Sequence, residues 1–126
     1  MADEAGTILL VDDEPIVIGV GKQMLEKLGF SVLTATSGME ALDIFKVNKD
    51  CIDLVVLDMI MPSMGAGDTY DGLRAIDPAI KVLLSSGYGI DDQTNELLKR
   101  GCKGFIQKPF NMQVLSTKIE EIMKGA

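Results

Sequence analysis

The sequence of 126 residues contains no histidine and no tryptophan. Without histidine, the chain cannot form a phosphohistidine of its own, so chemistry that uses one needs a separate donor protein. No apolar run approaches the roughly 20 residues that span a bilayer. The short apolar stretch near the start also lacks a preceding basic region, which argues against a signal peptide. We therefore expect a cytoplasmic chain without membrane contact.

Positive charge and cysteine are also scarce. The chain has 12 Lys and Arg residues against 19 Asp and Glu residues, which gives a net charge of −7 at pH 7. Because this charge repels phosphate backbones and the lysines are scattered, we expect no direct nucleic-acid binding. The two cysteines, Cys51 and Cys102, are expected to be free thiols, since isolated cysteines in a chain without export signals are usually reduced.

What the sequence does have is a regular alternation of short apolar runs and amphipathic segments. Apolar residues make up 47% of the chain and charged residues 25%, as in soluble globular domains. This length fits one domain, which we assign to residues 1–126 with a core of about 7–124. The alternation is typical of βα units, so the predicted fold class is α/β, with five parallel strands and five helices.

Five apolar runs bounded by polar residues or glycine predict the strands. The third run is apolar on both of its faces, as a central strand buried between two layers of helices must be. The predicted strands are Thr7–Val11, Ser31–Ala35, Asp53–Asp58, Ile80–Ser85 and Gly104–Gln107.

Capping residues and apolar spacing predict the first two helices. Pro15 lies in the first turn of one helix and Gly29 ends it. Its predicted buried stripe contains Val17, Val20, Met24 and Leu28. Ser37 and Glu40 form a capping box for the second helix. The apolar face of that helix contains Ala41, Leu42 and Phe45.

The second half of the chain predicts three more helices. Asp68–Ile76 contains Gly72, which costs about 1 kcal/mol relative to alanine inside a helix. Asp91–Arg100 has an acidic first turn and a basic last turn. Asn111 caps the last helix, which Lys124 and Gly125 end. The predicted buried stripe of this helix contains Val114, Leu115, Ile119, Ile122 and Met123.

Reactive side chains gather where the predicted strands end. Asp12 and Asp13 follow the first strand, Asp58 closes the third, Ser86 lies just beyond the fourth, and Lys108 follows the fifth. Ligands of open α/β sheets collect outside the carboxyl ends of the strands, so these side chains are expected to meet. Three converging carboxylates repel one another unless a cation joins them, and hard oxygen ligands suit Mg²⁺.

This combination predicts phosphoryl transfer to a carboxylate. One aspartate acts as the nucleophile, while the metal and Lys108 neutralise charge on the transferred group and Ser86 donates to the same oxygen. Taken singly, each segment has a simpler explanation as helix capping, strand termination or a polar loop. Their complementary chemistry at one predicted sheet edge favours a site.

Four segments give the sequence a specific resemblance to the response regulator receiver family of two-component signalling, over about Thr7–Met123. They are LVDDEP from Leu10, LDMIMP from Leu57, VLLSSG from Val82 and GFIQKPF from Gly104. The resemblance implies a flavodoxin-like, doubly wound sheet with the strand order 2-1-3-4-5.

Roles for individual residues follow from the same resemblance. It implies that Asp58 is the phosphoacceptor and that Lys108 holds the phosphoryl group. Asp13, Asp58 and the backbone carbonyl of Ile60 are implied ligands of Mg²⁺, with Asp12 acting largely through water. The family's motifs also imply a cis peptide bond between Lys108 and Pro109.

The resemblance further implies a conformational switch. Ser86 is expected to move toward the phosphoryl oxygen, and Phe105 is expected to follow it inward. A simpler alternative makes Phe105 an ordinary core aromatic. The sequence departs from the family at Ala66, where glycine is usual, and in the glycine-rich stretch Gly67–Gly72, so the geometry of this loop is left open.

The implied partner is a histidine kinase or a histidine phosphotransfer domain, with self-association at most as a weak homodimer. The motifs resemble receivers attached to hybrid sensor kinases, although a single-domain regulator also fits. In either case the chain is expected to be a phosphoacceptor and not an enzyme.

Three alternatives share parts of this pattern. A flavodoxin-type cofactor binder needs a phosphate loop after the first strand, where Asp12, Asp13 and Glu14 would repel the phosphate. An aspartyl phosphohydrolase usually has a second acid at the position of Ile60. A phosphorylation-independent adaptor of the same fold is the third.

Overall fold

The computed structural model describes residues 6–61 and 64–124, and within them five strands alternate with five helices. The order of elements is the one that the sequence predicts. The strands are β1 (Thr7–Val11), β2 (Ser31–Ala35), β3 (Ile52–Asp58), β4 (Lys81–Ser86) and β5 (Gly104–Gln107). The helices are α1 (Pro15–Lys27), α2 (Gly38–Asn48), α3 (Ala66–Ile76), α4 (Asp92–Arg100) and α5 (Met112–Lys124).

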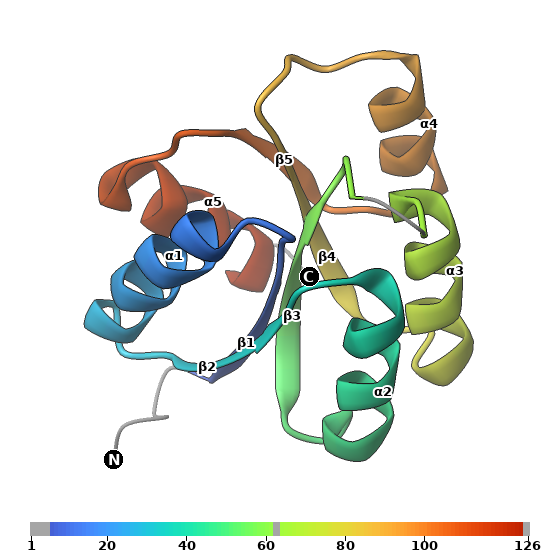
Figure 1. The fold of residues 1–126 in the computed structure, drawn as a ribbon, viewed down its shortest axis with the longest axis horizontal. Helices are drawn as coiled ribbons and strands as arrows, with labels where there is room; N and C mark the ends of the chain where they lie inside the picture. Colours follow the sequence, from blue (N-terminus) through green and yellow to red (C-terminus); the bar gives the residue numbers. More distant parts are fainter. Residues whose placement is uncertain (1–5, 62–63, 125–126) are drawn as a thin grey trace.

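The strands form one parallel sheet in the order β2-β1-β3-β4-β5, which confirms the predicted fold class and strand order. Helices α1 and α5 cover one face of the sheet, and α2, α3 and α4 cover the other (Figure 1). Each face has its own apolar core, because successive strand residues point to opposite sides. Leu10 and Leu54 pack on the α1 and α5 side, whereas Leu9 and Val55 pack on the other.

The central strand β3 carries one of the predicted site residues at its end. It begins one residue earlier than predicted, at Ile52, and pairs with both β1 and β4. All its residues from Leu54 to Asp58 are buried. An apolar sequence on both faces suits this position between two helix layers, and it fixes Asp58 in the middle of the sheet edge.

The buried face of α1 differs from the predicted stripe. Val20 is 46% exposed, and the buried residues are Gly21 and Leu25, while the other three predicted residues are half-buried. A Cβ atom at Gly21 would lie 2.9 Å from the side chain of Leu10 in β1. The prediction was wrong because it followed apolar residues and passed over a glycine, whose missing side chain permits this close approach.

Helix α3 begins two residues earlier than predicted, at Ala66, which is fully buried. Its internal glycine has a packing role. A Cβ atom at Gly72 would lie 2.7 Å from the side chain of Leu42 in α2. The residue that weakens α3 as an isolated helix therefore lets α2 and α3 pack closely.

The predicted capping residues act as caps. The Ser37 hydroxyl accepts a hydrogen bond from the Glu40 amide at 3.1 Å, and Glu40 accepts one from the Thr36 amide at 2.6 Å. Asp91 is the N-cap of α4, which starts at Asp92, one residue later than predicted. Asn111 caps α5 by accepting from the Val114 amide at 2.8 Å.

Two features of α5 complete the comparison with the sequence. Val114 was predicted to be buried but is 43% exposed, because its neighbour Leu115 faces the core and adjacent helix residues point about 100° apart. Leu115, Ile119 and Ile122 are buried as predicted. Gly125 lies outside the described residues.

Cys51 is exposed and Cys102 is buried, and both are free thiols, as predicted. Burial raises the pKa of Cys102 to about 12, so this thiol stays protonated at neutral pH. Within residues 6–61 and 64–124, every helix is too short or too polar to cross a bilayer.

Candidate functional site

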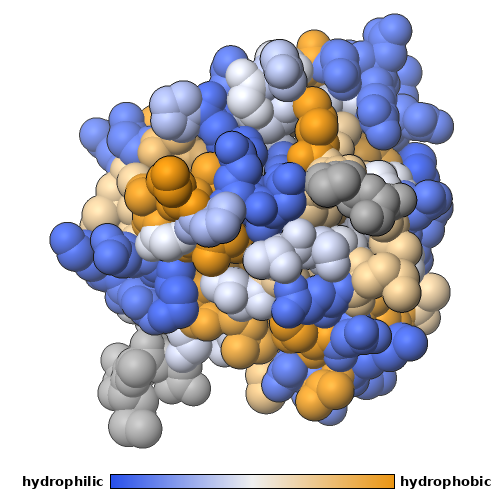
Figure 2. Space-filling view, viewed as in Figure 1, coloured by the Kyte–Doolittle hydropathy of each residue, from blue (hydrophilic) through white to orange (hydrophobic). Residues whose placement is uncertain are grey.

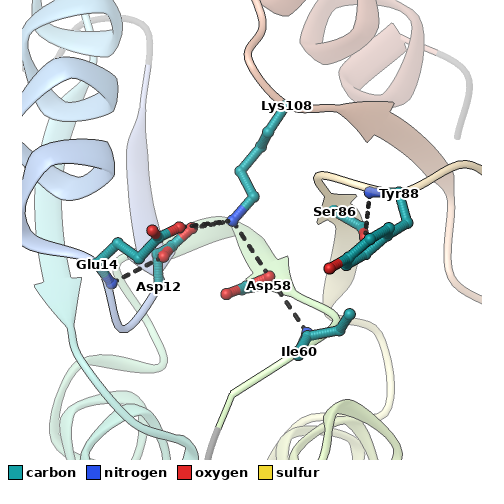
Figure 3. Close-up of polar contacts among 7 residues, drawn as sticks. All are labelled: Asp12, Glu14, Asp58, Ile60, Ser86, Tyr88 and Lys108. Carbon is teal, nitrogen blue, oxygen red and sulfur yellow. Dashed lines mark hydrogen bonds and ion pairs between the residues drawn. The ribbon is translucent and has the colours of Figure 1, made fainter.

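The carboxyl ends of four strands bring the predicted site residues to one edge of the sheet (Figure 3). Asp12 follows β1, Asp58 ends β3, and Lys108 follows β5. Ser86 was predicted to lie just beyond β4 but is its last residue. The amide of Lys108 donates to the Ser86 carbonyl at 2.7 Å, which holds the ends of β4 and β5 together.

Three aspartates form a compact acid cluster. Asp12, Asp13 and Asp58 each offer a carboxylate oxygen within 4.8 Å of those of the other two. Asp12 and Asp58 are almost fully buried, and Asp13 is half-buried. Such a set of hard oxygen donors is the type that holds Mg²⁺, with positions left for water.

Lys108 supplies positive charge inside this cluster. Its ammonium lies 2.9 Å from Asp12 Oδ2 and 3.4 Å from Asp58 Oδ1, and its side chain is only 13% exposed. Burial alone would lower the pKa of Lys108, but the hydrogen bond to Asp12 and the charge of Asp58 outweigh it and raise the pKa. The lysine is therefore a permanent cation between two buried carboxylates (Figure 3).

Asp58 differs from an ordinary surface aspartate. Burial, and then the charge of Asp12, raise its pKa to about 6, although the Ile60 amide and Lys108 oppose this shift. The Ile60 amide donates to Asp58 Oδ1 at 3.2 Å. Near pH 7 most of Asp58 is ionised, and its raised pKa makes it a more basic carboxylate than usual.

The predicted switch residues lie on the β4 and β5 side. Ser86 is 4% exposed, and its hydroxyl oxygen accepts a hydrogen bond from the Tyr88 amide at 3.0 Å. Phe105 is half-buried and packs against the apolar core on the α2, α3 and α4 side of the sheet. The peptide bond between Lys108 and Pro109 is cis, as the resemblance implied.

A groove of about 740 Å³ opens beside the acid cluster. Its walls include apolar residues of four segments: Ile16, Val17, Val20, Ile60, Tyr88 and Phe110. Figure 2 shows apolar surface over α1 and the start of α5, next to hydrophilic surface. Ile16 and Val20 are 80% and 46% exposed, so this apolar surface is available to another molecule.

Sequence reasoning gave Glu14 no role beyond its negative charge, yet it takes part in the site. Glu14 Oε1 lies 3.7 Å from the Lys108 ammonium. Its place directly after Asp12 and Asp13 was the available signal, but helix capping explained it equally well. Only the fold shows that the side chain turns toward Lys108.

Comparisons with known proteins identify relatives of this chain. Residues 8–120 match the family model described as the response regulator receiver domain. A sensor kinase, CckA of Brucella abortus, is 36% identical over 120 residues, which are 95% of this chain and 13% of that protein. The chemotaxis protein CheY of Thermotoga maritima is 32% identical over 118 residues, which are 93% of this chain and 97% of that protein.

A solved structure shows the same fold. The crystal structure of a response regulator receiver domain protein from Clostridium thermocellum superposes with a TM-score of 0.89 at 34% sequence identity, and covers 95% of each chain. The chain thus spans only a small part of the sensor kinase that it matches, and nearly all of the chemotaxis protein.

Proposed function

The chain belongs to the response regulator receiver family, and on that premise we propose that Asp58 accepts a phosphoryl group from a phosphohistidine in a two-component phosphorelay. The observation that supports this most directly is the contact of Lys108 with both Asp12 and Asp58 inside the acid cluster. This arrangement combines a basic carboxylate with positive charge that is fixed beside it.

Mg²⁺ is the proposed cofactor. The residues fit it, because three carboxylates whose oxygens lie within 4.8 Å of one another hold more negative charge than Lys108 offsets. Asp13, Asp58 and the Ile60 carbonyl would hold the ion, with Asp12 acting through water. When bound, Mg²⁺ supplies charge neutralisation for the transferred phosphoryl group.

The chain's own residues then perform the transfer. An Asp58 carboxylate oxygen forms a bond to phosphorus while the bond between phosphorus and the imidazole nitrogen of the donor breaks. The electron pair of the broken bond stays on that nitrogen. Lys108, already beside Asp58 Oδ1, neutralises negative charge on the phosphoryl oxygens, and the Ser86 hydroxyl donates to one of them.

The proposed readout is a switch on the β4 and β5 side. The Ser86 hydroxyl can donate a proton while its oxygen still accepts from the Tyr88 amide, so it has a free donor for a phosphoryl oxygen. A shift of Ser86 opens space toward Phe105, which is half-buried on the neighbouring strand β5, two residues before Gln107, the register partner of Ser86. Phosphorylation at Asp58 thereby changes the surface around β5.

The proposed partner is a histidine kinase or histidine phosphotransfer domain. The exposed apolar residues of the groove surround the acid cluster, so a protein that presents a phosphohistidine can bury them as it docks. The matches to a sensor kinase and to a chemotaxis protein fit both a receiver attached to a hybrid kinase and a single-domain regulator. In both, the chain acts as a phosphoacceptor.

Intact mass after treatment with acetyl phosphate and Mg²⁺ tests this function. The wild type should gain one phosphoryl group, and Asp58→Asn or EDTA should abolish the gain. Asp43→Asn, an exposed aspartate on α2, is the matched control and should label normally. Labelling that survives in Asp58→Asn would refute the assignment of the phosphoacceptor.

A further inference from the structure

Glu14 contacts the site from outside the acid cluster. Its carboxylate is the third that surrounds the Lys108 ammonium, at 3.7 Å, after Asp12 at 2.9 Å and Asp58 at 3.4 Å. The Glu14 side chain is 65% exposed, whereas those of Asp12 and Asp58 are 1% and 3% exposed. The carboxylates around the Lys108 ammonium are therefore buried on the side of Asp12 and Asp58 and exposed on the side of Glu14.

The position of Glu14 is fixed although its side chain is exposed. Its amide donates to Asp12 Oδ1 at 3.0 Å, and Pro15 follows it at the start of α1. A residue at this N-cap position usually accepts a hydrogen bond from the first turn of the helix. Within the described residues Glu14 makes no such bond, and its side chain turns toward Lys108 instead (Figure 3).

Resting on the proposed function, we propose that Glu14 is a positioning residue that competes with the incoming phosphoryl group for Lys108. The buried carboxylates of Asp12 and Asp58 cannot turn into water, because a buried charge without a partner is costly. Glu14 can, since it is already mostly exposed. It is therefore the carboxylate that gives up its place when a phosphoryl oxygen reaches the ammonium.

This competition selects between classes of phosphodonor. A small anionic donor has to displace Glu14 with little binding energy of its own. A protein donor also buries the apolar residues around the groove, and this offsets the same displacement. Glu14 thus disfavours labelling by free acyl phosphates more than labelling by a docked phosphohistidine protein.

Labelling at Asp58 over a range of acetyl phosphate concentrations, with saturating Mg²⁺, tests the role of Glu14. Glu14→Gln should lower the half-saturating donor concentration about two- to fivefold, the effect of one exposed charge at this distance. The limiting rate and the Mg²⁺ affinity, measured separately by calorimetry, should stay the same. High salt should shrink the difference because it screens exposed charges.

Two further variants separate competition for Lys108 from a general charge effect. Glu26→Gln, an exposed position about three turns further along α1, makes the same change in net charge and should leave the half-saturating concentration unchanged. Glu14→Asp keeps the charge but has a shorter side chain, which lengthens a distance to Lys108 that is already 3.7 Å, so it should behave more like Glu14→Gln than like the wild type.

The outcomes distinguish this inference from the function on which it rests. A wild type that takes up no phosphoryl group at all would overturn both. Normal labelling of the wild type, combined with an unchanged half-saturating concentration in Glu14→Gln, would overturn only the role of Glu14. The same holds for a shift in Mg²⁺ affinity, or for Glu14→Asp behaving like the wild type.

Discussion

The two sides of the acid cluster are built in opposite ways. On the β1 side, Asp12 is buried, and both of its oxygens accept hydrogen bonds, from the Glu14 amide and from Lys108. On the β4 side, residues 87–91 are all exposed, and a Cβ atom at Gly87 or Gly89 would meet nothing within 4 Å. Buried charges need partners held in place, whereas the movement that we propose for the Ser86 hydroxyl needs space around it.

Beyond the exposed residues of the β4 side, polar contacts of Arg74 and Arg100 join the end of α4 to α3. Arg74 donates to the Arg100 carbonyl at 2.9 Å and to the Tyr70 hydroxyl at 3.2 Å. The guanidinium groups of both arginines lie 5.6 Å from the centre of the Tyr70 ring. Arg100 also forms an ion pair with Asp71. These contacts hold the end of α4 against α3, whereas residues 87–91 before α4 are exposed.

The largest expected effect is on stability, and it follows from removing the buried cation Lys108. Lys108→Met leaves Asp12 and Asp58 buried without their cation, so the metal-free protein should lose about 3 kcal/mol of unfolding free energy at pH 8. Ser86→Ala should lose less than about 1 kcal/mol, since the Tyr88 amide that it releases lies in an exposed loop. Urea unfolding measures both losses of free energy. Equal losses would contradict the contrast between the buried β1 side and the exposed β4 side.

The second prediction concerns Asp58 and pH. Because the pKa of Asp58 is raised to about 6 in the folded state, its protonated form is favoured by folding. This contribution to stability is fully present below the unfolded pKa of about 4 and is lost as pH rises through about 6. Without metal, Asp58→Asn should be more stable than the wild type by up to about 3 kcal/mol at pH 8.

The control for this prediction is the same comparison at low pH. Below about pH 4 the carboxyl of Asp58 is neutral in both states, so the advantage of Asp58→Asn should vanish there. A stability difference that does not change between pH 4 and pH 8 would show that burial and Asp12 do not raise the pKa of Asp58 as described.

The third prediction separates metal binding from stability. Asp13→Ala should weaken Mg²⁺ binding by about tenfold or more, because it removes a proposed ligand. It should preserve or raise stability without metal, since it relieves repulsion among three close carboxylates. Calorimetric titration and thermal unfolding without metal measure the two effects. A clear loss of metal-free stability would favour helix capping as the role of Asp13.

The smallest expected effect is on the rate at which the phosphoryl group is lost, and it concerns the exposed residues Ile60 and Tyr88. Ile60 and Tyr88 are 59% and 70% exposed in the groove, and the Ile60 side chain offers no hydrogen bond to an attacking water. We expect slow loss of the phosphoryl group, and the double variant Ile60→Asn with Tyr88→Glu should accelerate it up to about tenfold. Decay of the phosphorylated mass after donor removal measures this. Equal or slower decay would show that water access at these positions does not set the lifetime.

Much of the fold followed from local patterns in the sequence. Strand β1, strand β2 and the caps at Ser37 and Asn111 lie where predicted, because alternation and capping depend on neighbouring residues. The predicted strand ends likewise place Asp12 and Asp58 at one edge of the sheet. The order of the strands within the sheet, 2-1-3-4-5, came from resemblance to the receiver family and not from these patterns, whereas their parallel direction followed from the alternation of strands and helices.

Other features depended on residues that are distant in the sequence. The buried face of α1 is set by how close Gly21 comes to Leu10, and Gly72 serves the contact of α3 with Leu42. The sequence by itself determined which residue types reach the carboxyl edge of the sheet, since the strand pattern carries that information. Only the tertiary structure decided the pairing of Glu14 with Lys108 and the raised pKa of Asp58, because the first joins segments distant in the sequence and the second arises from burial and the charge of Asp12.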